Sequence, residues 1–387
     1  KQQLKTFLSG QTQFKDYNFE GSNMSVLLDV LAYNSFQNNF YTNMAINEMF
    51  LDSAQIKNSV VSHAKELNYL PRSRKSARAV VNLTISDNTL TSQTLIIPQY
   101  TEFTTKYQGQ SFSFVTNESY IARKTGTGTY VSGDIEIFEG QMLTSFEREG
   151  YFIDDDGKLR VSLTNDTIDT DSISVFVDAE QTEDQNVFKY TSGIFGIKAD
   201  DKVFYIEPYF DDRYSVYFGR DIFGVQPTEA EDVRVRYRIT SGAEANGATN
   251  FNTSFISTAQ ITISTVNKAY GGAEREDLAS IRYFAPKSIQ IQERAVTTSD
   301  YEVLLKQKFP EITAVSAYGG DELDPPQFGK VAIAVYLQDD TQLISTTLSN
   351  AYIEFLKDRS PLSIEPVFVS TKFNMLILIL KYITLLS

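Results

Sequence analysis

The sequence predicts a multidomain α+β protein with a helical N-terminal region, a middle rich in antiparallel β-strands, and an α/β C-terminal module. Three observations predict this class. Apolar residues recur at helical spacing within residues 1–78, short β-branched and aromatic runs fill residues 79–240, and helical and strand patterns alternate over residues 241–387. A chain of 387 residues is long enough for two or three domains with separate cores.

The helical prediction for residues 1–78 depends on periodicity and on capping residues. Ser22 is placed to cap a helix that carries MSVLLDVLAYNSFQNNFYTNMAINEMF, in which apolar residues at steps of three, four and seven form one apolar face. Asp52 and Gln55 form a capping-box pattern that predicts a second helix. Pro71 ends that helix, because the residue before a proline is excluded from the helical region.

The first predicted helix carries more apolar surface than two helices can bury. Aromatic and methionine side chains crowd into the segment between residues 33 and 50. We hypothesise that they pack in an inter-chain helical bundle, because otherwise a large apolar patch would face water. The candidate interface residues are Tyr33, Phe36, Phe40, Tyr41, Met44 and Phe50.

The segment PRSRKSAR is a local positive patch in an acidic chain. It contains Arg72, Arg74 and Lys75, followed closely by Arg78. Two interpretations are open. The segment is either a solvated linker or a docking patch for an acidic neighbour, in which case Arg72, Arg74 and Lys75 belong to the interface.

The β prediction for residues 79–240 depends on short runs such as AVVNLTI, SFSFV, SVYFG and VRVRYRI, separated by turn sequences such as SDNT, GTGT and DDDG. Strands at this spacing are typical of one or two antiparallel β domains. In DDDG, Asp156 and Gly157 form a dipeptide that favours a hairpin. The later glutamate that a calcium loop requires is not at the right spacing.

Residues 241–387 are predicted to form the α/β module. One helix begins near Glu274 and ends at Pro286, and Ser299 with Glu302 forms a capping box ahead of YEVLLKQKF. EITAVSAY and KVAIAVYL read as strands, TTLSNAYIEFLKDRS as a helix and LSIEPVFVS as a strand. The order helix–strand–strand–helix–strand predicts a split β-α-β, ferredoxin-like unit.

The sequence AYGG occurs twice, in AYGGAERED and in AYGGDELD. A phosphate-binding loop needs glycines before a helix N-terminus and usually a lysine after them, whereas here acids follow both pairs. We therefore predict a geometric role, in which glycine supplies a positive φ at a sharp turn. The predicted turn residues are Gly271, Gly272, Gly319 and Gly320.

Composition excludes several classes of function. Without cysteine, the chain forms no disulfide framework and no thiolate metal site, which fits a reducing compartment. Its one histidine, His63, removes most zinc and Ser-His-Asp chemistry and is predicted to pack in the second helix or at an interface. The formal net charge of −14 disfavours a nucleic-acid partner. We expect no catalytic site, no metal and no cofactor.

Neither end of the chain carries a predicted membrane span. The sequence begins at Lys1 rather than Met, so we expect a few residues before it, and no signal peptide is visible. The apolar run FNMLILILKYITLL, at residues 373–386, includes Lys381 and is shorter than the roughly 20 residues that a span needs. We predict a buried or partner-covered strand there.

Several stretches, in order along most of the chain, resemble one family. Residues 14–73 look like the N-terminal region of the baseplate wedge proteins of T-even-like contractile-tailed phages. IIPQYTEFTTKYQGQSFSFVT is similar to a stretch of Baseplate J-like proteins. Four further stretches resemble the C-terminal core of this family: YRITSGAEANG, AYGGAERED, APKSIQIQERAVTTSDYEVLL and AYGGDELDPPQFGKVAIAV.

This resemblance implies a structural subunit of the virion without a catalytic site. Such proteins associate with themselves and with other wedge proteins, and the wedges join around a central hub next to the tail tube. They hold the baseplate ring together, take part in the rearrangement that triggers sheath contraction, and assemble in the host bacterial cytoplasm. The acids after each AYGG are then solvent or interface charges.

Two other classes of function remain open from the residues alone. A β-rich receptor- or glycan-binding fibre protein would explain residues 79–240 but not the N-terminal helices. A hydrolase that uses paired acids is the third possibility, although the absence of tryptophan disfavours a sugar substrate.

Overall fold

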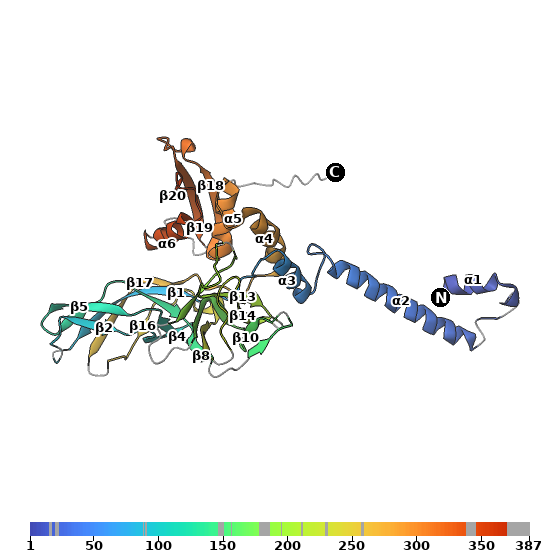
Figure 1. Cartoon of the computed structure of the whole chain (residues 1–387), viewed down its shortest axis with the longest axis horizontal. Coiled ribbons are helices and arrows are strands. Elements are labelled where there is room, and N and C mark those ends of the chain that lie inside the picture. Colours follow the sequence, from blue (N-terminus) through green and yellow to red (C-terminus); the bar gives the residue numbers. More distant parts are fainter. Residues whose placement is uncertain are drawn as a thin grey trace, which may run out of the picture. The chain divides into compact units, whose positions relative to one another are not determined.

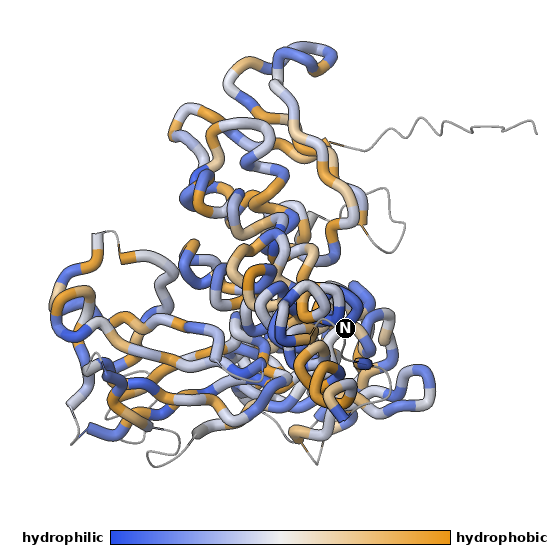
Figure 2. The backbone as a smooth tube through the Cα atoms, turned by 90° about the vertical axis from the view of Figure 1, so that its right-hand side faces the viewer, coloured by the Kyte–Doolittle hydropathy of each residue, from blue (hydrophilic) through white to orange (hydrophobic). Residues whose placement is uncertain are grey.

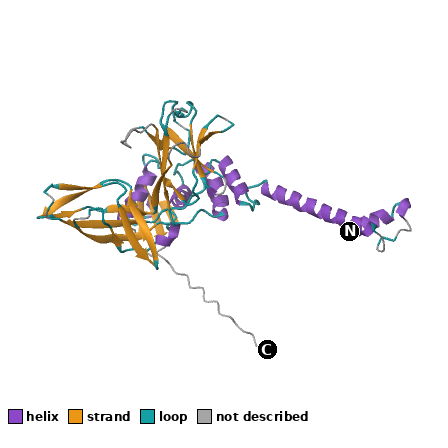
Figure 3. Ribbon diagram, turned by 90° about the horizontal axis from the view of Figure 1, so that it is seen from below, coloured by secondary structure: helices purple, strands orange, loops and turns teal. Residues whose placement is uncertain are grey.

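The computed structural model describes residues 1–14, 18–19, 23–87, 89, 91–145, 151–155, 157–177, 186–194, 196–209, 212–228, 231–256, 259–337 and 346–369. The chain divides into two compact units, Lys1–Leu67 and Asn68–Ser387. The described part of the first is helical, whereas strands dominate the second (Figures 1 and 3). The α+β class, the helical N-terminus and the β-rich middle are therefore confirmed. The strand predicted at residues 373–386 lies outside the described residues.

The described residues of the first unit form three α-helices and one short 3₁₀ turn. They are α1 (Gln2–Ser9), the turn Thr12–Phe14, α2 (Met24–Glu48) and α3 (Lys57–Glu66). Around the start of α2, Leu28 and Phe19 are buried, and the Phe14 and Phe19 rings lie 6.1 Å apart. The Lys1 ammonium pairs with Asp29 at 2.5 Å. This small cluster covers only the beginning of α2.

The boundaries of the N-terminal helices differ from the sequence prediction. Helix α2 is preceded by Asn23 as its N-cap, and Ser22 lies outside the described residues. The predicted capping box at Asp52 is wrong, because α3 begins only at Lys57. The carboxylate of Glu48, in the preceding helix, accepts the hydrogen bonds at the start of α3 instead.

Glu48, the last residue of α2, caps the start of α3. Its carboxylate accepts hydrogen bonds from the backbone N–H of Gln55 at 2.9 Å and of Ile56 at 3.2 Å. The His63 imidazole lies 2.8 Å from the Glu48 carbonyl oxygen, so this histidine packs inside the unit. Helix α3 ends at Glu66, before the predicted proline stop, and Asn68 then takes a positive φ of 55°.

The first sheet of the second unit has nine strands, all paired antiparallel. They are β1 (Arg78–Ser86), β2 (Thr94–Ile97), β3 (Glu102–Tyr107), β4 (Gln110–Thr116), β5 (Tyr120–Gly126), β6 (Thr129–Val131), β7 (Ile135–Glu139), β16 (Phe251–Asn252) and β17 (Gln260–Tyr270). Their order is β16-β3-β4-β7-β1-β6-β5-β2, with β17 also paired to β1.

Alternation along β1 explains why this sheet has a core. Val81, Leu83 and Ile85 are buried, whereas Asn82 and Thr84 between them are half-buried. Figure 2 shows apolar and polar residues interspersed along the backbone. Strands β16 and β17 lie beyond residue 240, so this sheet extends past the domain boundary predicted there.

The second sheet has eight strands and is formed by the next part of the chain. They are β8 (Gln141–Ser145), β9 (Tyr151–Ile153), β10 (Leu159–Ser162), β11 (Ile168–Val177), β12 (Val187–Tyr190), β13 (Val203–Pro208), β14 (Tyr214–Phe218) and β15 (Val233–Ile239). Their order is β8-β15-β11-β12-β13-β14-β10-β9, antiparallel except for the parallel pair β12–β13. Strands β9 and β10 pair antiparallel on either side of DDDG, as a hairpin requires, and Asp156 lies outside the described residues.

A C-terminal module completes the second unit. Its elements are α4 (Leu278–Ile291), α5 (Thr298–Lys308), β18 (Ile312–Gly319), β19 (Lys330–Leu337), α6 (Thr346–Lys357) and β20 (Glu365–Val369). The order helix–strand–strand–helix–strand is as predicted from α5 onward. The split arrangement is not found among the described strands, because β19 and β20 pair directly in parallel with no strand between them.

The helices of this module begin and end at other residues than predicted. Helix α4 starts at Leu278 rather than near Glu274, and its N-cap Asp277 accepts a hydrogen bond from the Ser280 N–H at 2.7 Å. Pro286 does not end it, because the helix continues to Ile291. The proline costs the helix one backbone hydrogen bond, and burial of its neighbours Ile281 and Ala285 offsets that loss.

The capping box of α5 lies two residues earlier than predicted. Thr297, not Ser299, is the N-cap, and Asp300, not Glu302, is its partner. The Asp300 carboxylate accepts from the Thr297 N–H at 2.8 Å. The Glu302 carboxylate instead accepts from the N–H of Ala317 in β18 at 3.0 Å. A capping box does precede this helix, but both of its residues and its register differ from the prediction.

Only one of the four predicted turn glycines has a positive φ. Gly271 has φ 78°, whereas Gly272 and Gly320 are needed for close approach of the backbone and Gly319 for neither reason. A Cβ on Gly272 would overlap the Gly242 carbonyl oxygen. A Cβ on Gly320 would overlap the carbonyl oxygen of Gln327 and lie 2.8 Å from that of Lys330.

We expect Gly320→Ala to destabilise the C-terminal module by about 1–3 kcal/mol, because the added methyl group meets rigid backbone. Gly319→Ala is the matched control. Its Cβ would meet only the Asp321 side chain, which can rotate away, and its φ of −63° suits alanine. Thermal unfolding of both variants checks the prediction. Equal melting temperatures would contradict it.

Candidate functional site

Helix α2 presents an apolar surface to solvent. All of the side chains predicted for an inter-chain contact in this segment are exposed, from 39% for Met44 to 65% for Tyr33 and Phe36. The Phe40 and Tyr41 rings meet edge to face at 5.8 Å, and within α2 only Leu28 is buried. At 25 residues, the helix is about 38 Å long. The described residues of its unit do not cover this surface.

The exposed apolar surface is wider than the single face that periodicity predicted. The further exposed apolar side chains in and directly after α2 are Val26, Leu27, Val30, Leu31, Ile46 and Met49. A helix that is apolar on most sides is normally buried among other helices. The sequence pattern identified the aromatic and methionine side chains of the patch, with Leu27 and Val30, but not Val26, Leu31 and Ile46.

The basic segment before β1 has partners within the chain, so it is not a solvated linker. Arg74 pairs with Glu274 at 3.0 Å, and Arg78 lies 3.5 Å from Glu311. The Lys75 ammonium donates to the Lys308 carbonyl oxygen at 2.8 Å. The basic segment thus neutralises acids that follow it by about 200 residues in the sequence.

Glu276, in the first AYGG motif, is a buried hydrogen-bond acceptor rather than a solvent or interface charge. Its carboxylate accepts from the Tyr69 hydroxyl at 2.8 Å, the Arg72 N–H at 3.0 Å and the Ser280 hydroxyl at 2.7 Å. Burial and the adjacent Glu276 carboxylate raise the pKa of Tyr69, so its hydroxyl stays protonated and donates. The hydrogen bonds of Glu276 therefore link the start of the second unit to α4.

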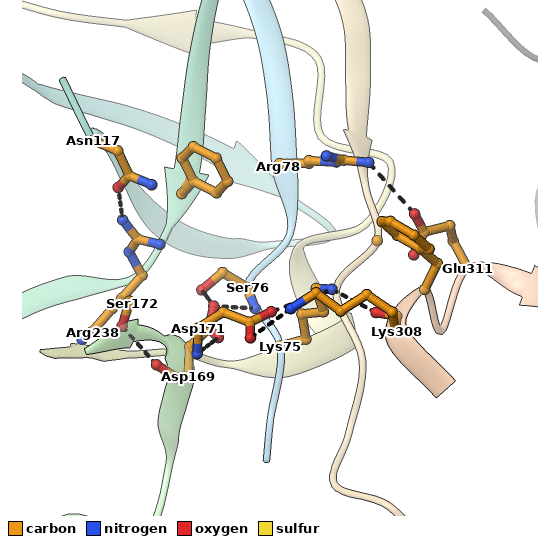
Figure 4. A pocket seen from close by; sticks show the side chains of 13 residues that line it. Lys75, Ser76, Arg78, Asn117, Asp169, Asp171, Ser172, Arg238, Lys308 and Glu311 are labelled. Carbon is orange, nitrogen blue, oxygen red and sulfur yellow. Dashed lines mark hydrogen bonds and ion pairs between the residues drawn. The ribbon is translucent and has the colours of Figure 1, made fainter. Parts of the chain in front are cut away.

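A second polar cluster lies where the two sheets meet the C-terminal module (Figure 4). Asp171 of β11 pairs with the Lys308 ammonium at 2.9 Å and with the Lys75 ammonium at 3.6 Å. Partial removal of water would raise the pKa of Asp171, but the Lys308 and Lys75 charges outweigh it and lower that pKa to about 2. Asp171 therefore stays ionised at neutral pH and joins the second sheet to α5.

Glu311 supplies the corresponding contact to the first sheet. It is buried, faces Arg78 of β1, and accepts a hydrogen bond from the Tyr352 hydroxyl of α6 at 3.2 Å. The Arg78 guanidinium also lies over the Tyr270 ring, 4.8 Å from its centroid. Sequence reasoning identified none of these acids as structural, because their partners are far away in the chain.

The same region contains a partly open cavity of about 200 Å³. Its polar lining comes from Lys75, Ser76, Arg78, Asn117, Asp169, Asp171, Ser172, Arg238, Lys308 and Glu311. Asp169 is buried, and its carboxylate accepts from the Ser76 hydroxyl at 2.6 Å and from the Ser76 N–H at 3.1 Å. Charged and polar groups thus line this cavity, and they come from all three parts of the second unit.

One acid of the DDDG turn has a structural partner. Asp154, in the DDDG turn, and Glu207 both pair with Arg160 at 2.6 Å. Among the described residues, no three histidine, aspartate or glutamate side chains are placed to share a metal ion. In the same residues, no helix has the length and apolar character to cross a membrane.

Two segments of the chain match known protein families. Residues 1–69 match the family described as baseplate wedge protein gp6-like, helical domain. Residues 297–369 match the family described as baseplate structural protein gp6, C-terminal domain I. The first match contains the exposed helix α2, and the second contains α5 and the three-stranded sheet.

Over most of its length the chain is similar to the baseplate wedge protein gp6 of Enterobacteria phage T4. The two are 27% identical over 403 residues, which cover 96% of this chain and 58% of the relative. This chain therefore spans a little more than half the length of that relative.

Two baseplate assemblies have chains of distantly similar structure. A chain of the anti-feeding prophage baseplate is 14% identical with a TM-score of 0.29, and covers 95% of this chain and 77% of its own. A chain of the type VI secretion TssK-TssF-TssG baseplate subcomplex is 8% identical with a TM-score of 0.33, and covers 91% and 99%. TM-scores of this size do not establish a shared fold. By its two family matches and its aligned relative, this chain is similar to baseplate wedge proteins.

Proposed function

We propose that this chain is a structural subunit of the baseplate wedge in a contractile phage tail. The alignment with the phage T4 wedge protein, which covers 96% of the chain, carries this proposal. The exposed apolar surface of α2 supports it independently, because a folded chain with such a surface requires a protein partner. The role is one of assembly, and we assign no catalytic activity.

Helix α2 is the part of the chain that we assign to inter-chain contact. In our proposal, Tyr33, Phe36, Phe40, Tyr41 and Met44 pack in a helical bundle with a second copy and with other wedge proteins. Phe50, just after α2, extends the same surface. A helix packed inside a bundle of helices buries such residues on every side, which agrees with the distribution of apolar residues around α2.

The remaining parts of the chain have other roles in this proposal. Residues 241–387 resemble the core of Baseplate J-like proteins, and we assign them to contacts between subunits in the ring around the hub. Although Arg72, Arg74 and Lys75 have partners within the chain, each keeps part of its side chain accessible, so they also remain interface candidates. The subunit would assemble in the host cytoplasm, stay in the virion tail and rearrange when the sheath contracts.

Fractionation of purified virions tests the location. Tails, baseplates and detached fibres are separated, and the chain is quantified in each fraction by mass spectrometry. We expect it to remain with baseplates in fixed ratio to other wedge proteins. If it separates with the fibres, the wedge assignment is wrong and the receptor- or glycan-binding alternative replaces it.

A further inference from the structure

Arg238, in the second sheet, is a buried cation without a carboxylate in contact. The residue is 1% exposed, yet no described carboxylate lies within ion-pair distance of its guanidinium. The guanidinium donates to the Asn117 side-chain oxygen and lies 5.0 Å from the centroid of the Phe138 ring. Its Nε atom has no hydrogen-bond partner among the residues that the structure describes.

The acids near Arg238 are engaged by other donors. Asp169 accepts from both the N–H and the hydroxyl of Ser76. Glu139 accepts from the Thr240 hydroxyl at 2.5 Å and from the Ser241 hydroxyl at 2.9 Å. Both contribute charge at a distance, but neither bonds to the guanidinium. A buried charge with an unmet donor is destabilising unless a partner supplies the missing interaction.

The other charges of the cavity leave an excess of positive charge. The lining contains four cations, Lys75, Arg78, Arg238 and Lys308, and three carboxylates, Asp169, Asp171 and Glu311. Lys75 and Lys308 share Asp171, and Arg78 faces Glu311. In Figure 4 these groups gather around Asp171 and Glu311, whereas Arg238 lies apart from them beside Asn117.

We propose that this cavity binds a small inorganic oxyanion of the phosphate or sulfate class on the Arg238 guanidinium. A guanidinium presents neighbouring N–H groups in one plane, which suits an oxyanion better than a spherical halide. The volume of about 200 Å³ is several times the roughly 30 Å³ that one water occupies in the liquid, so there is room for a tetrahedral ion.

A bound oxyanion would act at the junction of the three parts of the second unit. Arg238 belongs to β15, Lys75 and Arg78 lie at the start of the first sheet, and Lys308 ends α5. An anion bound on Arg238, in the cavity that these residues line, would offset the excess positive charge there and stabilise the junction of the C-terminal module with both sheets. Binding would therefore stabilise the second unit in proportion to anion concentration.

Equilibrium dialysis of the purified full chain against radiolabelled orthophosphate tests the site, with sodium chloride keeping ionic strength constant. We expect saturable binding of a single phosphate. Arg238→Lys keeps the charge but removes the planar donor array, and should weaken binding by at least about tenfold. Arg234→Lys is the matched control on the same strand, because Arg234 is 41% exposed and pairs with Asp232. It should bind as the unchanged chain does.

Two results would overturn the proposal. One is the absence of saturable phosphate binding by the unchanged chain, and the other is equal affinity in Arg238→Lys. A variant of a buried arginine can fail to fold. Anomalous diffraction from crystals of the unchanged chain soaked in selenate is therefore a separate test. An anomalous peak beside the Arg238 guanidinium supports the site, and its absence there contradicts it. Neither outcome depends on the wedge assignment.

Discussion

Phe40→Asp is expected to abolish assembly of the chain with its wedge partners while the second unit stays folded. Phe40 is 54% exposed in the middle of α2, and our proposal places it inside an inter-chain bundle. Burying about 100 Å² of such a ring contributes about 2.5 kcal/mol, and a carboxylate in its place adds a desolvation cost. Together these effects should weaken association by a factor of about 100 or more.

Sedimentation of co-expressed wedge proteins measures this loss, and circular dichroism reports whether the β-sheets persist. Asn39→Asp is the matched control. It adds the same charge one residue earlier on α2, and the change from Asn has a similarly small effect on helix propensity. We expect Asn39→Asp to co-sediment with its partners. Normal assembly by Phe40→Asp would remove α2 from the proposed interface.

Glu276→Ala is expected to destabilise the second unit by about 2–4 kcal/mol. The change leaves the Tyr69 hydroxyl, the Arg72 N–H and the Ser280 hydroxyl without their common acceptor in a buried place. The free energy of unfolding should therefore fall although no apolar contact of comparable size is lost. Chemical denaturation followed by tyrosine fluorescence and circular dichroism measures it.

Glu274→Ala provides the comparison within the same AYGG motif. The Glu274 side chain is 55% exposed and makes one ion pair, to Arg74 at 3.0 Å. An exposed pair of this kind contributes at most about 1 kcal/mol. A loss of stability in Glu274→Ala as large as that in Glu276→Ala would show that the buried hydrogen bonds of Glu276 are not what stabilises the junction.

Local pattern was sufficient to predict most elements of the fold. Alternating residues in β1 and β15 carry a two-residue period because one face of each strand is buried. Strand β17 alternates as well, but Thr262, Ser264 and Lys268 on its exposed side make it polar, and no strand was predicted there. It was missed because one of its faces is in water and its partner β1 lies about 180 residues earlier.

Capping registers were predicted less well, because several residues in a row are able to cap. The sequence Thr297, Thr298, Ser299, Asp300 offers more than one possible N-cap, and only packing of Tyr301 and Leu304 into the core selects Thr297. The cap of α3 is a more extreme case, since it comes from Glu48 in the preceding helix.

The candidate interface was predictable because it depends on an excess of apolar side chains in α2. Helix α2 has more apolar side chains than its neighbours can bury, and this follows from composition alone. The exposure of Phe36 and Tyr41 agrees with it. The charged junction around Asp171 and Glu311 was not predictable, because long-range pairing is not encoded in local spacing. The same limit hid Arg238, because the stretches VRVRYRI and YRITSGAEANG that contain it do not show that it is buried without a carboxylate in contact.

Cross-linking of intact tails followed by mass spectrometry tests the wedge assignment most directly. Lys57 and Lys65 report on α3 in the helical unit, and Lys287 and Lys330 report on the C-terminal module. We predict links from the first pair to a second copy of the chain or to other wedge proteins, and from the second pair to neighbouring subunits of the ring. Links only to fibre proteins at the periphery of the tail would contradict the account.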